Sequence, residues 1–195
     1  MEFIAHRINT IEALKKVPKN YGVELDLRDY KDNIILNHDP FSDGELFEDY
    51  LDHYQHGTMI LNIKSERIES QVLKLLKNHN IKNYFFLDSS FPMIYALSET
   101  GEKNIAIRFS EYETLDSVIT MASRVNWVWV DCFQKLPITK KEYNILKDKG
   151  LNLCLVSPEL QNRDQEIEIY KKYLQENNIF FDAICTKVHN IKRWL

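Results

Sequence analysis

The chain has 195 residues, of which 44% are hydrophobic and 28% are charged, a composition typical of one globular domain with a substantial core. Its formal net charge of -4 argues against a protein that mainly binds nucleic acid by nonspecific attraction. We therefore expect a single domain over residues 1–195 and no nucleic-acid partner.

Short apolar runs alternate along the chain with longer segments of helical period. We expect eight strands, at residues 2–6, 22–27, 58–64, 83–88, 104–109, 127–133, 151–157 and 180–186. Most of the segments between them carry apolar residues at i, i+3, i+4 and i+7, which predicts helices. These segments are residues 10–17, 67–80, 91–101, 112–125, 138–150 and 164–178.

The alternation predicts an α/β fold with a parallel sheet, and eight strand–helix units predict a compact (β/α)8 TIM barrel. About 24 residues per unit is short for this fold, so we expect one helix to be reduced to a turn or missing. The second unit is the weakest, because strand 22–27 is followed by a further apolar run and an acidic segment without a clear helical pattern.

The N-terminus and the cysteines indicate the compartment. The first ten residues lack a charged region followed by a long apolar run, and no stretch of about 18 apolar residues occurs. The three cysteines are widely spaced in apolar runs, which favours buried free thiols over disulfides or a zinc site. We expect a soluble, cytoplasmic protein without membrane insertion.

Polar side chains gather where the predicted strands end. They are His6, Arg7, Glu24, Asp26, Asn62, Lys64, Asp88, Arg108, Asp131 and Lys187. Barrels of this kind hold their active sites at the carboxyl ends of the strands, so we expect these residues at one mouth. Residues two apart on a strand point to the same face, so Glu24 pairs with Asp26, and Asn62 with Lys64, and we expect both pairs to face inward.

The two acids in an apolar strand need a compensating charge. Carboxylate and amide oxygens suit hard cations such as Mg²⁺ or Ca²⁺, and Glu24, Asp26 and Asn62 would supply three ligands. The alternative is a structural network in which the acids form salt bridges with Arg7, Arg28 or Lys64.

Two histidines accompany the predicted metal site. His6 ends the first strand, and His38 follows twelve residues after Asp26. Histidines on opposite sides of a phosphate can act as general base and general acid, one for the nucleophile and one for the leaving oxygen.

Basic side chains at the same strand ends suit a phosphate group. Arg7 and Lys64 would neutralise phosphate oxygens as charge builds on them. We also expect Arg108 and Lys187 to bind substrate, with a place on the rim, away from substrate, as the alternative.

Several runs resemble the glycerophosphodiester phosphodiesterase family, within the group of phosphatidylinositol-phospholipase-C-like phosphodiesterase barrels. They are IAHR at 4–7, GVELDLRDYKDNIILNHDP at 22–40, MILNIKSE at 59–66 and DAICTK at 182–187. These are similar to the family's HRG opening, E-x-D pair, His-Asp pair, E-I-K strand and final D-G-I-x-T-D pattern. The resemblance spans almost the whole chain and implies a TIM barrel that hydrolyses phosphoric diesters with a divalent metal.

By position, the resemblance implies that the two histidines are the acid/base pair, that the acids of strand 22–27 bind metal, and that Arg7 and Lys64 contact phosphate. Two positions depart from the family pattern. Ile8 stands where the family has a glycine, and Asn62 stands where it has a third metal-binding glutamate. The site therefore has one negative charge fewer. The acidic segment after His38 is also much shorter than the subdomain that glycerol-handling members insert there.

We predict a metal-dependent phosphodiesterase that acts on a small phosphodiester. Hydrolysis by water and attack by a neighbouring substrate hydroxyl, which forms a cyclic phosphate as a lyase does, both fit the same histidine pair. A catalytically weakened barrel that binds a phosphorylated ligand or a protein partner is the other alternative, because Asn62 is neutral. The sequence carries no signal for the oligomeric state.

Overall fold

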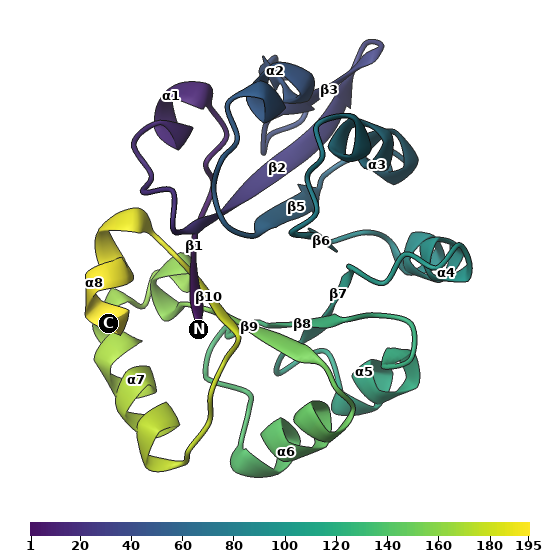
Figure 1. Ribbon diagram of the computed structural model, residues 1–195. Helices are drawn as coiled ribbons and strands as arrows, with labels where there is room; N and C mark the ends of the chain where they lie inside the picture. Colours follow the sequence, from purple (N-terminus) through teal and green to yellow (C-terminus); the bar gives the residue numbers. More distant parts are fainter. The chain divides into compact units, whose positions relative to one another are not determined.

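The computed structural model describes residues 1–195, and the chain divides into two compact units. Residues 4–100 form one unit, and residues 1–3 together with residues 101–195 form the other. Strand β1 (Glu2–Ala5) contributes residues to both (Figure 1).

The 4–100 unit is organised around parallel strands. β2 (Gly22–Tyr30) pairs with β1 and with β5 (Met59–Ile63), and β5 pairs with β6 (Tyr84–Leu87). The helices of this unit are α1 (Ile11–Leu14), α2 (Phe47–Asp52), α3 (Glu69–Asn78) and α4 (Phe91–Glu99). The register of β2 with β5 places Asp26 directly beside Asn62.

A short antiparallel extension follows strand 22–27, where the sequence shows no clear helical pattern. β2 continues to Tyr30, β3 (Asn33–Leu36) folds back on it, and β4 (Glu45–Leu46) pairs with β3. Helix α2, which lies beside β3 in Figure 1, has only six residues. The expected reduction of a helix is thus confirmed, and α1 is also a single turn of four residues where we expected a helix over 10–17.

The loop between β3 and β4 is held close to the end of β3. A Cβ atom on Gly44 would lie 2.3 Å from the carbonyl oxygen of Leu36, so the chain passes too near for any other residue. Asn37 Nδ2 donates to the carbonyl of Asp43 at 2.6 Å, and Asn37 Oδ1 accepts from the backbone N–H of Asp39 at 2.9 Å. These contacts fix the backbone on both sides of His38.

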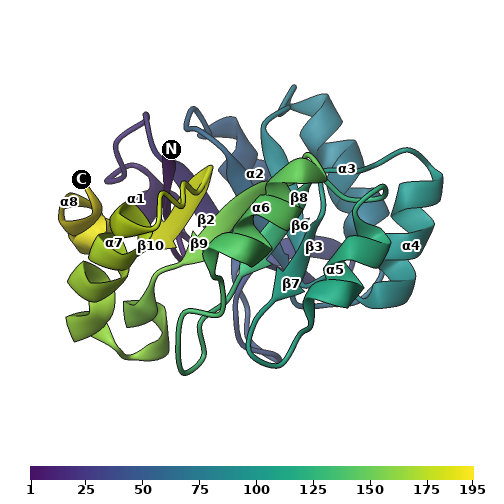
Figure 2. The ribbon, with the colours of Figure 1, turned by 90° about the horizontal axis from the view of Figure 1, so that it is seen from below.

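The other unit has four consecutive parallel strands. They are β7 (Ala106–Phe109), β8 (Trp127–Val130), β9 (Asn152–Val156) and β10 (Ala183–Thr186), paired in this order. The α-helices are α5 (Leu115–Met121), α6 (Lys140–Asp148), α7 (Ile167–Glu176) and α8 (Ile191–Trp194). Three 3₁₀ turns, Pro158–Gln161, Asp164–Glu166 and Val188–Asn190, complete it. Figure 2 shows α6 between α5 and α7, in a row alongside these strands.

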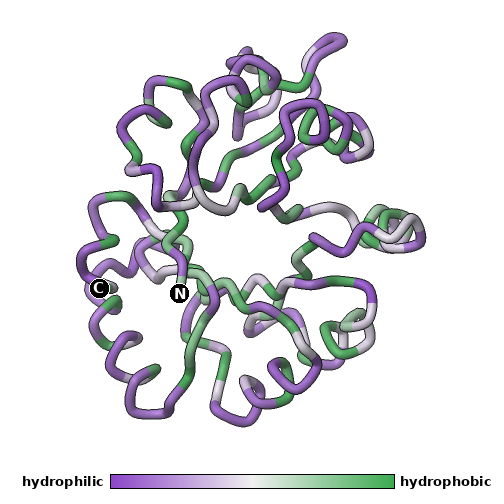
Figure 3. The backbone as a smooth tube through the Cα atoms, viewed as in Figure 1, coloured by the Kyte–Doolittle hydropathy of each residue, from purple (hydrophilic) through white to green (hydrophobic).

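Local chemistry explains where these helices begin and end. Thr139 and Glu142 form a capping box at the start of α6, which satisfies backbone N–H groups that have no partner within the helix. Gly150, with a φ of 76°, follows its end, because glycine adopts this left-handed conformation without strain. In Figure 3 the helices alternate between hydrophilic and hydrophobic residues along the chain, as expected for helices that bury one face.

The eight strands expected from the sequence are all present, and two further strands, β3 and β4, extend the first unit. The core consists mainly of strand residues, and the free thiols of Cys132, Cys154 and Cys185 are buried in it, as expected. The helices fall short of the length and apolar character that a membrane span requires.

Candidate active site

The acid pair lies on β2 within the 4–100 unit. Glu24 is 1% exposed and Asp26 is 0% exposed, so both carboxyl groups are withdrawn from water. Asn62, on the neighbouring strand β5, donates from Nδ2 to Glu24 Oε1 at 2.8 Å. The three predicted metal ligands therefore lie on one face of the sheet, as their spacing indicates.

Glu24 is surrounded by donors on the side of strand β1. The backbone N–H of Arg7 donates to Glu24 Oε2 at 2.8 Å, and His6 Nε2 lies 3.7 Å from the same oxygen. Burial raises the pKa of Glu24 to about 7, and the negative charge of Asp26 acts in the same direction. The hydrogen bonds from Asn62 and Arg7 oppose this rise without cancelling it.

Asp26 is held by a residue that the sequence analysis did not identify. Asn9 donates from Nδ2 to Asp26 Oδ2 at 2.8 Å, and its Oδ1 accepts from the backbone N–H of Asp26 at 2.8 Å. The other carboxylate oxygen, Oδ1, is buried and accepts no hydrogen bond, with Lys64 Nζ at 3.7 Å. Asn9 lies three residues after His6 in an irregular segment, where periodicity carries no information about side-chain contacts.

Two buried oxygens in this cluster have no hydrogen-bond partner, Asp26 Oδ1 and Asn62 Oδ1. Unpartnered buried acceptors on adjacent strands suit a bound cation, and carboxylate and amide oxygens are the ligands that Mg²⁺ and Ca²⁺ prefer. No group of three or more His, Cys, Asp and Glu side chains is placed to hold one metal ion. The donor set that fits a cation is therefore two carboxylates and one neutral amide.

His38 lies in the segment after β3, in the same unit. Its ring Nδ1 is 2.8 Å from Asp39 Oδ1, and its side chain is 40% exposed. The hydrogen bond from His38 lowers the pKa of Asp39, and the positive charges of Arg7 and Arg28 act in the same direction. A carboxylate on Nδ1 leaves Nε2 as the ring nitrogen that can exchange a proton with a substrate.

Arg28 links the His38 segment to the end of β5. It donates from Nε and Nη2 to the carbonyl of His38 at 3.1 and 2.9 Å, and from Nη1 to the carbonyl of Lys64 at 2.9 Å. From the sequence, Arg28 is expected only as a possible salt-bridge partner for the acids. Its position directly after strand 22–27 was the available signal for a role beside the site.

Lys64 and Arg7 lie next to the acids, as expected. Lys64 Nζ is 3.3 Å from Asp88 Oδ2, and Arg7 Nε is 3.9 Å from Asp26 Oδ2. Arg7 has a φ of 54°, a left-handed conformation, so the chain turns at this residue. Ile8 is buried, and its carbonyl accepts from the hydroxyl of Tyr50 at 2.9 Å, which fixes the loop.

Arg108 and Lys187 belong to the other unit. Arg108 Nη1 donates to the buried Asp131 carboxylate at 2.5 Å, and Gln161 donates to the second oxygen of that carboxylate at 2.9 Å. The side chain of Lys187 is exposed, while its backbone N–H donates to Glu159 at 3.0 Å. The contact of either side chain with a substrate stays a prediction.

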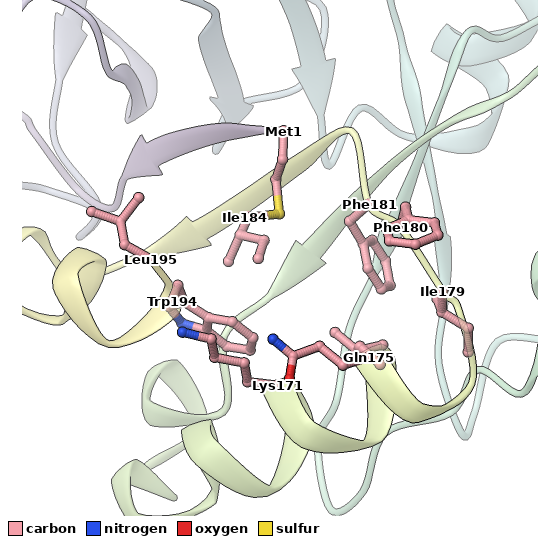
Figure 4. A pocket seen from close by; sticks show the side chains of 10 residues that line it. Met1, Lys171, Gln175, Ile179, Phe180, Phe181, Ile184, Trp194 and Leu195 are labelled. Atoms are coloured by element: carbon pink, nitrogen blue, oxygen red, sulfur yellow. The ribbon is translucent and has the colours of Figure 1, made fainter.

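A separate cavity of about 380 Å³ lies in the unit of residues 1–3 and 101–195 (Figure 4). Lys171 and Gln175 are the polar residues of its lining, and Met1, Phe181 and Trp194 are among the apolar ones. It contains none of the predicted site residues. We assign it no part in the chemistry of the acid pair.

The fold and the site define a class of protein. Parallel strands joined by helices, with charged side chains at the carboxyl ends of the strands, are the features of an α/β barrel that carries a polar site at its mouth. Similarity to solved structures agrees with this class. No protein-family model matches the sequence, and neither does any curated protein.

Solved structures of two glycerophosphodiester phosphodiesterases are similar to this chain over nearly its whole length. The enzyme from Agrobacterium tumefaciens has a TM-score of 0.68 at 13% identity, with 96% of this chain and 97% of that chain covered. The enzyme from Parabacteroides distasonis has a TM-score of 0.68 at 11% identity, with 99% and 85% covered. A mutant tryptophan synthase α-subunit from Pyrococcus furiosus matches less well, with a TM-score of 0.52 at 13% identity, covering 98% and 88%. These likenesses show the fold, a (β/α)8 TIM barrel, and confirm the predicted fold class.

The raised pKa of Glu24 predicts how cation binding depends on pH. A cation competes with the proton for a carboxylate, so its apparent affinity should be constant above about pH 8 and fall by about tenfold per pH unit well below pH 7. Calorimetric titration with Mg²⁺ or Ca²⁺ between pH 5.5 and 8.5 measures this. Glu24→Gln should bind more weakly with a flatter profile, whereas His6→Ala should keep the slope. A flat wild-type profile would contradict the assignment of Glu24 as a ligand.

Proposed function

We propose that this protein is a metal-dependent phosphodiesterase that cleaves a small phosphodiester. The observation that carries the proposal is the buried pair Glu24 and Asp26, with oxygens on Asp26 and Asn62 that accept no hydrogen bond and with His6 Nε2 3.7 Å from Glu24. The same fold occurs in solved glycerophosphodiester phosphodiesterases, which supports this reaction class. Fold alone does not define chemistry, whereas the residues of the site do.

The cation would be held by Glu24, Asp26 and the amide oxygen of Asn62, with Mg²⁺ and Ca²⁺ as the candidates. When bound, it would polarise a phosphoryl oxygen and lower the pKa of a hydroxyl nucleophile. Arg7 and Lys64 add positive charge beside the acids, since Lys64 Nζ lies 3.7 Å from Asp26 Oδ1. Their role is to stabilise negative charge on the phosphate oxygens in the transition state.

Proton transfer is assigned to the two histidines. His6 lies beside Glu24, so it is the better placed of the two to take a proton from a nucleophile close to the metal ligands. His38, with Nδ1 on Asp39, would present Nε2 to the leaving oxygen and donate a proton to it. The contact with the aspartate fixes the orientation of the ring.

The direct test is turnover of a panel of diesters, including glycerophosphodiesters and nitrophenyl diesters, in water enriched in oxygen-18. Hydrolysis by water places the label in the monoester as it forms, whereas attack by a substrate hydroxyl releases an unlabelled cyclic phosphate. Asp26→Asn serves as the control for contaminating activity. Either product supports a phosphodiesterase and decides between hydrolase and lyase.

The second candidate is a weakened barrel that binds a phosphorylated ligand without cleaving it. Asn62 favours this candidate, because a neutral amide leaves the site with two acidic ligands, and the ammonium of Lys64 already lies near Asp26. Binding of phosphate esters without turnover of any diester in the panel would support the binding protein and contradict the enzyme.

The proposed partner is the small substrate itself, and we propose no nucleic-acid or membrane partner. The buried free thiols agree with a reducing compartment, so the cytoplasm is the proposed location. Fractionation of the native host cells, followed by detection of the protein with an antibody, checks this.

A further inference from the structure

Asn9 makes two contacts with Asp26 that the proposed function leaves unused. Its Oδ1 accepts the backbone N–H of Asp26 at 2.8 Å, and its Nδ2 donates to Asp26 Oδ2 at 2.8 Å. Asp26 is fully buried, and a hydrogen bond to a carboxylate away from bulk water is strong. We propose that Asn9 is a positioning residue that holds the Asp26 carboxylate in its cation-binding orientation, an inference that rests on the proposed function.

The backbone of the loop after β1 places Asn9 in this position. β1 pairs with β2 as far as Ala5, which lies opposite Val23. The loop then stays attached to β2, because the backbone N–H of Arg7 donates to the Glu24 carboxylate and that of Ile8 donates to the Glu24 carbonyl, both at 2.8 Å. The side-chain amide of Asn9 follows, and it bonds to Asp26 as the next peptide group of a paired strand would. The backbone hydrogen bonds of Arg7 and Ile8 thus place the Asn9 side chain beside Asp26.

The two contacts decide which oxygen of Asp26 is available. Oδ2 accepts from Asn9, so the carboxylate cannot rotate about its χ2 bond without losing this hydrogen bond. Oδ1 then remains buried without a hydrogen bond, on the strand neighbour of Asn62, whose own Oδ1 also has none. Asp26 would therefore bind the cation through Oδ1 alone. Outer partners of ligating carboxylates typically contribute 10- to 100-fold in metal affinity.

A purely structural anchor is the competing explanation, because the same contacts hold the loop against β2. Asn9→Asp separates the two roles. An aspartate keeps an oxygen that accepts the Asp26 N–H, but it replaces the Nδ2 donor with a carboxylate oxygen facing Asp26 Oδ2. The variant keeps the hydrogen bond that holds the loop to the backbone of Asp26, but it loses the one that orients the Asp26 carboxylate.

The experiment measures the dissociation constants of Mg²⁺ and Ca²⁺ by calorimetry, and the melting temperature of the metal-free protein, for the wild type, Asn9→Ala, Asn9→Asp and Thr10→Ala. Thr10 caps α1 from the next position in the chain, with its hydroxyl accepting from the backbone of Ala13 at 3.1 Å, and it is the matched control for loop stability. Asn9→Ala and Asn9→Asp should each weaken cation binding by about 10- to 100-fold. In Asn9→Asp the new carboxylate lies on the Oδ2 side of Asp26, away from the proposed cation, and it repels the Asp26 carboxylate out of its orientation, which should outweigh the attraction of the added charge. Thr10→Ala should lower the melting temperature by a few degrees and leave the affinity within twofold of the wild type.

Equal affinity in the wild type and both Asn9 variants would overturn the positioning role while leaving the metal site intact. A parallel loss of affinity in Thr10→Ala would also overturn it, because loop stability would then explain the effect. A wild-type protein that binds neither cation would overturn the proposed metal site and this inference together. The three failures are thus distinguishable in one set of titrations.

Discussion

His38→Ala is expected to lose about 10²- to 10⁴-fold of its activity on an alkyl phosphodiester while it retains much of its activity on a nitrophenyl phosphodiester. A general acid matters in proportion to how poor the leaving group is, and nitrophenolate departs without a proton. His6→Ala is expected to be impaired on both substrates, because the nucleophile must be deprotonated whichever leaving group the substrate carries. Steady-state values of kcat/KM for the two variants on both substrates measure the difference.

His53→Ala is the control for this pair, since His53 is an exposed histidine at the end of α2. It should match the wild type on both substrates. All three variants should melt within a few degrees of the wild type, because His6 and His38 are expected to contribute more to function than to packing and His53 is exposed. If His6→Ala and His38→Ala stay near wild-type activity on both substrates, the acid/base assignment is wrong, and the binding protein becomes the better proposal.

The strands could be predicted because each is a short apolar run bounded by polar residues, and the sheet buries them almost completely. For example, the run 127–133 contains β8 (Trp127–Val130), and the run 151–157 contains β9 (Asn152–Val156). The helix expected over 10–17 is only one turn, although it contains apolar residues at helical spacing. Short helices depend on tertiary packing for most of their stability, so periodicity alone could not determine its length.

The candidate site could be predicted in part, for a reason that concerns strand geometry. Glu24, Asp26 and Asn62 lie on paired strands, where the spacing of two residues decides which side chains share a face. Asn9 was missed, and Arg28 makes other contacts than the salt bridges considered for it, because the contacts of both depend on loop conformation and on bonds to backbone atoms. Arg28, for example, bonds to the carbonyls of His38 and Lys64, two residues that are 26 positions apart in the sequence.

Removal of divalent cations by a chelating resin is expected to abolish diester cleavage, and Mg²⁺ or Ca²⁺ is expected to restore it. The reason is that Asp26 and Glu24 are buried side by side, and their mutual repulsion is relieved when a cation binds between donors of the site. Asp26→Asn removes one of the two charges, so it should lose cation binding without losing its fold. Asp29→Asn, on an exposed position of the same strand, is the matched control and should behave as the wild type.

Asn62→Asp tests the third ligand with opposite expected signs for two measurements. In the metal-free protein the change removes the donor that Asn62 Nδ2 provides to Glu24 and adds a third carboxylate beside two buried ones, so the melting temperature should fall. With Mg²⁺ or Ca²⁺ present, the added charge should tighten binding, so the rise in melting temperature on adding the cation should exceed that of the wild type. A salt-bridged structural network without a cation site predicts only the first change, because nothing would then offset the added charge. Equal destabilisation of the variant with and without cation would therefore contradict the assignment of Asn62 as a ligand. Full activity of the wild type after chelation would contradict a metal-dependent reaction.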